Sequence, residues 1–137
     1  MNEDFVTIEI AKKLHENGFN EPCINAINPY GCTYLNGWCE YLDNRDGEYI
    51  TQQDLKAGCY LLPTISQVLK WLRNEKKIYV SILPFATHST INKVAFYYLI
   101  EYNSTGETME GIEQNTYCAE WKDAAFAGIE YVLDNLI

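Results

Sequence analysis

The sequence has few of the residues that build metal and catalytic sites. It contains only two histidines, His15 and His88, and neither has a cysteine or an acidic residue at the spacing of a metal-ligand pair. Its eight glycines do not form a phosphate-binding loop, and no serine lies in a recognisable hydrolase motif. We therefore predict no catalytic residue, no metal and no cofactor.

The five cysteines are an odd number and include no Cys-x-x-Cys pair. The acidic N-terminus also lacks the basic segment and apolar core of a secretory signal, which predicts a cytoplasmic protein. Thiols stay reduced in that compartment, so we interpret these residues as free thiols packed as small hydrophobic groups. They are Cys23, Cys32, Cys39, Cys59 and Cys118.

Long hydrophobic runs are absent too. No apolar run approaches the roughly 20 residues needed to cross a bilayer, which excludes a transmembrane helix. Hydrophobic residues nevertheless make up 47% of the 137 residues and aromatic residues 14%, which is enough to offset the entropy of folding and exclude intrinsic disorder. The sequence therefore predicts one soluble domain over residues 1–137.

Positive charge is scarce, because ten basic residues against nineteen acidic residues give a net charge of -9. Most of the basic residues lie in 55–100, between acidic flanks over 1–54 and 101–137. A negative field repels nucleic-acid backbones, so we expect no direct binding of DNA or RNA. Acidic mimicry of a nucleic acid stays open as an alternative function.

Hydrophobic spacing predicts three helices. The first spans about residues 7–17, with Thr7 as its N-cap and Gly18 in the left-handed position after its last turn. The second is Pro63–Trp71, followed by basic residues that suit the carbonyl end of a helix. The third is Ala119–Leu136, and the small residues in its middle would let its axis approach a sheet closely.

Alternating patterns predict strands between these helices. Cys23–Asn28 and Thr33–Tyr41 form one hairpin, and Ile78–Leu83 and Val94–Tyr102 form another across the loop Pro84–Thr90. Both faces of the strand Val94–Tyr102 are expected to be covered at least in part, and the polar stretch that follows is a long connection or a short strand. The prediction is an α+β domain in the order α-β-β-α-β-β-α. Its last two helices pack on one face of an antiparallel sheet of about four or five strands.

Aromatic residues gather around the first hairpin. Aromatic side chains are favoured where a partner buries surface, although they also fill the edge of a shallow core. An exposed face of the predicted sheet is a second candidate surface. The strand Val94–Tyr102, expected as an exposed edge strand, would invite pairing of two copies into a homodimer unless charges or a loop cover it. The predicted aromatic surface consists of Tyr30, Tyr34, Trp38, Tyr41 and Tyr49.

These observations favour a non-enzymatic accessory protein that binds another, unidentified protein. One alternative is a small hydrolase or nuclease whose site gathers carboxylates or a Cys-His pair from distant segments. The other is the acidic nucleic-acid mimic. Nothing in the sequence indicates a membrane partner.

Segments at the start, middle and end of the chain resemble one family. The family consists of small uncharacterised proteins encoded by Bacteroides-type gut bacteria and by their phages and mobile elements. The resemblance implies an origin among bacterial or phage accessory genes and implies no catalytic activity. The segments that carry it are Ala11–Leu14 with Gly18–Cys23, Pro63–Arg73 with Lys76–Val80, and Trp121–Ala125.

Overall fold

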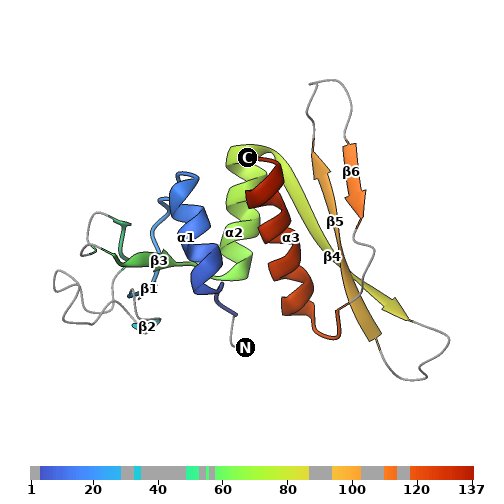
Figure 1. Ribbon diagram of the computed structural model, residues 1–137, viewed down its shortest axis with the longest axis horizontal. Coiled ribbons are helices and arrows are strands. Elements are labelled where there is room, and N and C mark those ends of the chain that lie inside the picture. The colour runs from blue at the N-terminus through green and yellow to red at the C-terminus, as the bar shows by residue number, and fades with distance from the viewer. Residues whose placement is uncertain are drawn as a thin grey trace. The chain divides into compact units, whose positions relative to one another are not determined.

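Helices and antiparallel sheets make up the described part of the chain, which confirms the predicted α+β class. The computed structural model describes residues 4–28, 33–34, 49–52, 55, 58–86, 94–102, 110–113 and 118–137. The chain divides into two compact units, Met1–Thr64 and Ile65–Ile137, which are coloured from blue to green and from green to red in Figure 1. That one domain spans residues 1–137 stays a prediction.

The first helix, α1 (Ile8–Glu16), begins and ends on the caps that the sequence predicts. The Thr7 side-chain oxygen accepts a hydrogen bond from the backbone N–H three residues on, at 3.3 Å. Gly18 follows the helix with φ +88°, a left-handed conformation that glycine adopts without strain. The Phe19 N–H then donates to the Leu14 carbonyl at 2.9 Å, which closes the helix in a Schellman motif.

A small antiparallel sheet accompanies α1 in the first unit. Its order is β2 (Thr33–Tyr34), β1 (Asn25–Ile27) and β3 (Tyr60–Leu62). The pairing of β1 with β2 confirms the predicted hairpin, although its turn lies outside the described residues. Helix α1 packs on β3, where the ring of His15 meets that of Tyr60 edge-on at 5.4 Å.

The second unit begins with a short helix that changes its pitch. α2 (Ile65–Trp71) continues into the π-helical turn η3 (Leu72–Lys76). The Lys77 N–H closes that turn by donating to a carbonyl five residues earlier, and Lys77 itself is left-handed with φ +57°. Trp71 is buried, as its place beside the apolar stripe predicts, and the Lys76 ammonium lies 5.4 Å from its ring centroid.

A second antiparallel sheet follows, in the order β4 (Ile78–Ala86), β5 (Val94–Tyr102) and β6 (Glu110–Glu113). The predicted second hairpin is present, since β4 pairs with β5 from Ile78 opposite Tyr102 to Ala86 opposite Val94. The polar stretch after β5 contains the short strand β6, which is one of the two alternatives that the sequence predicts.

Several expectations differ from the observed strands and sheets. β4 continues through Pro84 and Phe85 to Ala86, where we expected a loop. β5 is the central strand, so it is not the edge that would invite a second copy. The single sheet of four or five strands and the α-β-β-α-β-β-α order are not confirmed. The described strands form two separate sheets. The strands that precede α2 in the sequence pair with one another, and so do the strands that follow it.

The last helix, α3 (Trp121–Asn135), lies against one face of β4 and β5 (Figure 1). Its buried residues include Ala124, Ala125 and Gly128, as the run of small residues predicts. A Cβ added at Gly128 would stand 3.1 Å from atoms of Tyr98 on β5 and of Val80 on β4. A side chain at position 128 would therefore require Tyr98 or Val80 to shift by a few tenths of an ångström. α2 contacts α3 in turn.

We expect Gly128→Val to lower the free energy of unfolding by about 2 kcal/mol, because its methyl groups overpack the helix-sheet contact. Lys122→Val places the same side chain on an exposed position of α3 and should cost about 0.5 kcal/mol or less. Urea denaturation followed by circular dichroism measures both. Equal losses would contradict the close approach.

We expect Lys77→Gly to raise the free energy of unfolding by about 1 kcal/mol, since glycine removes the left-handed strain at this residue. The Lys77 ammonium donates to the Asn74 carbonyl at 3.1 Å, but this exposed hydrogen bond contributes little. Lys77→Ala deletes the same side chain without relieving the strain and should give no gain. Thermal unfolding of the two variants separates them.

Candidate partner-binding surface

Helix α3 packs against one face of the β4-β5 pair. Successive strand residues point to opposite faces, and the contacts of Gly128 place Val80 and Tyr98 on the helix side. Ile100 on this face is fully buried, and Tyr98 is 8% exposed. The described residues of this inner face are Ile78, Val80, Ile82, the exposed Pro84, Phe96, Tyr98, Ile100 and Tyr102.

The opposite face of the pair carries the other half of the alternation, and we call it the outer face. Tyr79 on it is 41% exposed, Glu101 opposite Tyr79 is exposed, and the others are half-buried. The expectation that both faces of β5 are covered in part agrees with this pattern. The outer face consists of Tyr79, Ser81, Leu83, Ala95, Tyr97, Leu99 and Glu101.

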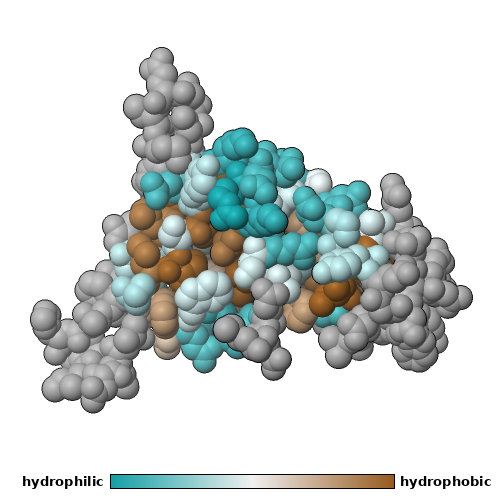
Figure 2. Space-filling model, turned by 180° about the vertical axis from the view of Figure 1, so that it is seen from behind, coloured by the Kyte–Doolittle hydropathy of each residue, from teal (hydrophilic) through white to brown (hydrophobic). Residues whose placement is uncertain are grey.

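The outer face is mainly aromatic and aliphatic. Leu83 lies directly opposite Tyr97 and forms a cross-strand pair with it, whereas Leu99 next along β5 lies opposite Ser81. Glu101 is its one charged member. Figure 2 shows hydrophobic residues at the surface of the unit that contains β4 and β5. Such a face, with large side chains half-exposed, has the composition of a protein-protein contact.

The aromatic surface predicted from the sequence is largely untested. Tyr30, Trp38 and Tyr41 lie outside the described residues. Tyr34 is in β2, and Tyr49 is 66% exposed just before Ile50, which bridges to Cys23. These five aromatic residues therefore remain a predicted surface.

Sequence reasoning named neither Tyr79 nor Leu83 as a site residue, although the alternation around them was visible. The pattern of Ile78–Leu83 separates two faces but does not say which one a helix covers. The useful signal was the mixture of Tyr, Ser and Leu on one face against continuous aliphatic residues on the other.

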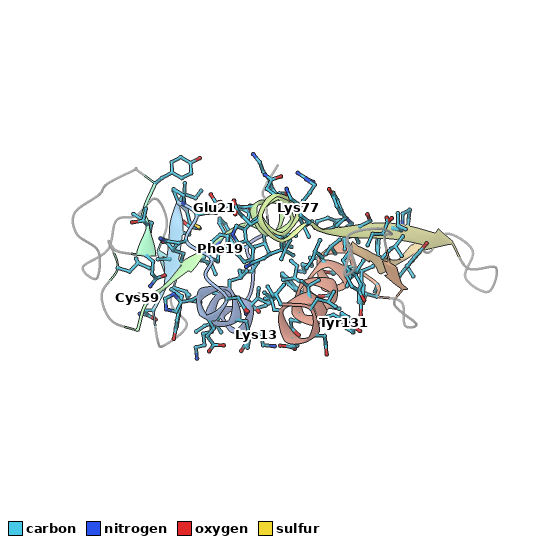
Figure 3. The ribbon with its side chains drawn as sticks, turned by 90° about the horizontal axis from the view of Figure 1, so that it is seen from above. Lys13, Phe19, Glu21, Cys59, Lys77 and Tyr131 are labelled. Carbon is cyan, nitrogen blue, oxygen red and sulfur yellow. The ribbon has the colours of Figure 1, made fainter. Side chains whose placement is uncertain are left out.

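Two phenol rings and a thiol meet where α3 passes β5. The ring centroids of Tyr98 and Tyr131 are 6.2 Å apart, and Figure 3 shows Tyr131 extending from α3. The Cys118 backbone pairs with that of Phe96, also on β5. Burial raises the pKa of the Tyr98 phenol, and the nearby Tyr131 and Cys118 raise that pKa further. The Tyr98 phenol therefore stays protonated at neutral pH, and its ring contact with Tyr131 lies between α3 and β5.

The cysteines that the structure describes lie outside any disulfide. Cys23 and Cys59 are buried in the first unit, and Cys118 is half-buried in the second. The Cys23 thiol donates to the Glu21 carbonyl at 3.3 Å. No three His, Cys, Asp or Glu residues within the described ranges come together as metal ligands would. Cys32, Cys39 and His88 lie outside those ranges.

Comparison with known proteins gives no family for the chain. No protein-family model matches it, and neither a curated protein nor a solved structure matches it. The resemblance to small proteins of gut bacteria therefore stays a prediction. Of the helices that the structure describes, none has the length and hydropathy needed to cross a membrane.

We expect the free energy of unfolding to fall as pH rises above about 10, the ordinary pKa of tyrosine. The raised pKa of Tyr98 means that the unfolded chain loses this proton more readily than the folded chain does. Stability from this group is therefore present below pH 10 and lost above it. Urea denaturation across that pH range should show a shallower fall for Tyr98→Phe, and parallel curves would contradict this.

Proposed function

We propose that this chain is a non-enzymatic protein-binding domain and that the outer face of β4 and β5 contacts its partner. The observation that carries the proposal is the contrast between the two faces of one strand pair. One face lies under α3, and the other presents Tyr79 at 41% exposure among half-buried Leu83, Tyr97 and Leu99.

The chemistry of the outer face indicates what kind of partner fits it. Burying its tyrosines and leucines requires an apolar patch of similar extent on the other protein. Glu101 stands opposite Tyr79 and is exposed, so a lysine or arginine at the rim of that patch would pair with it. The net charge of -9 also favours encounter with a basic protein.

The other predicted roles are not favoured by a specific contact among the described residues. A cytoplasmic location and an origin among bacterial or phage accessory genes are part of this proposal. They rest on the N-terminal sequence and on the resemblance. The hydrolase, nuclease and nucleic-acid-mimic hypotheses stay as alternatives from the sequence.

Affinity capture from a lysate of a Bacteroides-type gut bacterium tests the proposal. The bait variant Tyr79→Ala/Leu83→Ala truncates the outer face, and we expect it to retain its partner at least about tenfold less than the wild type. Quantitative mass spectrometry of the captured proteins gives this ratio.

Trp121→Ala is the matched control, because Trp121 is an aromatic residue of the same unit with a similar exposure of 39%. It should capture the same protein as the wild type, and circular dichroism should show all baits folded. A wild-type bait that captures nothing beyond the double variant would overturn the proposal.

A further inference from the structure

β4 is one of the two edge strands of its sheet and carries no charge along its nine residues. Among the described residues, β4 pairs only with β5, and no isolated bridge reaches it. Proteins usually protect such edges with lysines, prolines, bulges or short strands. Within β4, Pro84 is the one residue of these protective kinds.

The hydrogen bonds of β5 show which backbone groups of β4 point outward. A residue in an antiparallel strand directs its N–H and C=O to the same side, and the next residue directs them to the other side. Phe96 exchanges both of its bonds with Cys118, at 2.8 Å and 2.7 Å, so its polar groups point away from β4. Phe96 lies opposite Pro84, and this pair is therefore the non-hydrogen-bonded kind.

The side to which the backbone groups point therefore alternates along β4, counted from Pro84. Tyr79, Ser81 and Leu83 direct their N–H and C=O groups to β5, and the residues between them direct theirs to the open edge. Pro84 shares the outward parity, which explains how a proline fits in β4 without removing a bond of the β4-β5 ladder. The outward N–H groups belong to Ile78, Val80 and Ile82.

We propose that β4 pairs in antiparallel fashion with β4 of a second copy of the chain, through the outward groups of Ile78, Val80 and Ile82. In the register that places Val80 opposite Val80 of the second copy, Ile78 lies opposite Ile82. Every outward N–H group then meets a carbonyl, and Pro84 falls beyond the paired stretch. A two-fold axis relates the copies and joins the two sheets into one.

A second copy fits this edge because the edge is complementary to itself. Its donors and acceptors alternate at matched spacing, and the strand is rich in the β-branched residues that favour pairing. Lys76 and Lys77 precede β4, so antiparallel pairing keeps the cations of the two copies at opposite ends. Each copy carries a net charge of -9, so added salt should strengthen the pairing.

The pairing is independent of the proposed function. Outer-face side chains stand roughly perpendicular to the sheet, whereas the pairing extends the sheet sideways. The Tyr79→Ala/Leu83→Ala variant should therefore still form the dimer. Loss of partner capture and loss of dimerisation report on different surfaces.

Sedimentation velocity over about a hundredfold range of protein concentration tests the pairing. We expect the mass to rise from one copy to two, and the midpoint to move to lower concentration in higher salt. Ile82→Pro removes an N–H group that points to the open edge, as the backbone of Pro84 does. The β4-β5 pairing should therefore tolerate the proline, while the dimer should be lost. Ile82→Thr keeps that N–H and the β-branched shape, and it should still dimerise.

Amide hydrogen exchange on the wild type keeps the test decisive even if Ile82→Pro does not fold. Exchange at Ile78, Val80 and Ile82 should slow at least about tenfold between dilute and concentrated protein. The inward amides of Tyr79, Ser81 and Leu83 should be protected at both concentrations. A mass of one copy at every concentration, or uniform exchange along β4, would overturn the proposal.

Discussion

The contact between α3 and the β4-β5 pair is the constraint on which the second unit depends. Gly128 brings the helix backbone so close to Tyr98 and Val80 that no other side chain fits without displacing them. Because strand side chains alternate, seating the helix on one face assigns every residue of both strands to the inside or to the outside. The half-exposed aromatic and aliphatic outer face is the direct consequence.

The backbone N–H and C=O groups of a strand also alternate, and they point within the plane of the sheet rather than perpendicular to it. The bonds between Phe96 and Cys118 determine which N–H groups of β4 are left at the edge, just as Gly128 determines which side chains are left on the outer face. One short strand thus presents a side-chain surface and a backbone surface that do not compete.

Local features were predictable because nearby residues determine them. Thr7 and Gly18 cap α1 through bonds that close within a few residues, and the β4-β5 hairpin follows from alternation on both sides of a turn. The arrangement of sheets was not predictable, since alternation identifies a strand without naming its neighbour. For this reason the single-sheet expectation is not confirmed, and the expected edge position of β5 was wrong.

By itself the sequence determined the α+β class, the caps of α1, the small-residue stripe of α3 and the two faces of each long strand. These depend on conformational preference and on spacing along the chain. Only the tertiary structure decided which face α3 covers, that β5 is central, and that β4 lies at the edge with Pro84 pointing outward. Those outcomes depend on which segments, distant in sequence, come together to bury apolar surface, and no local pattern records that choice.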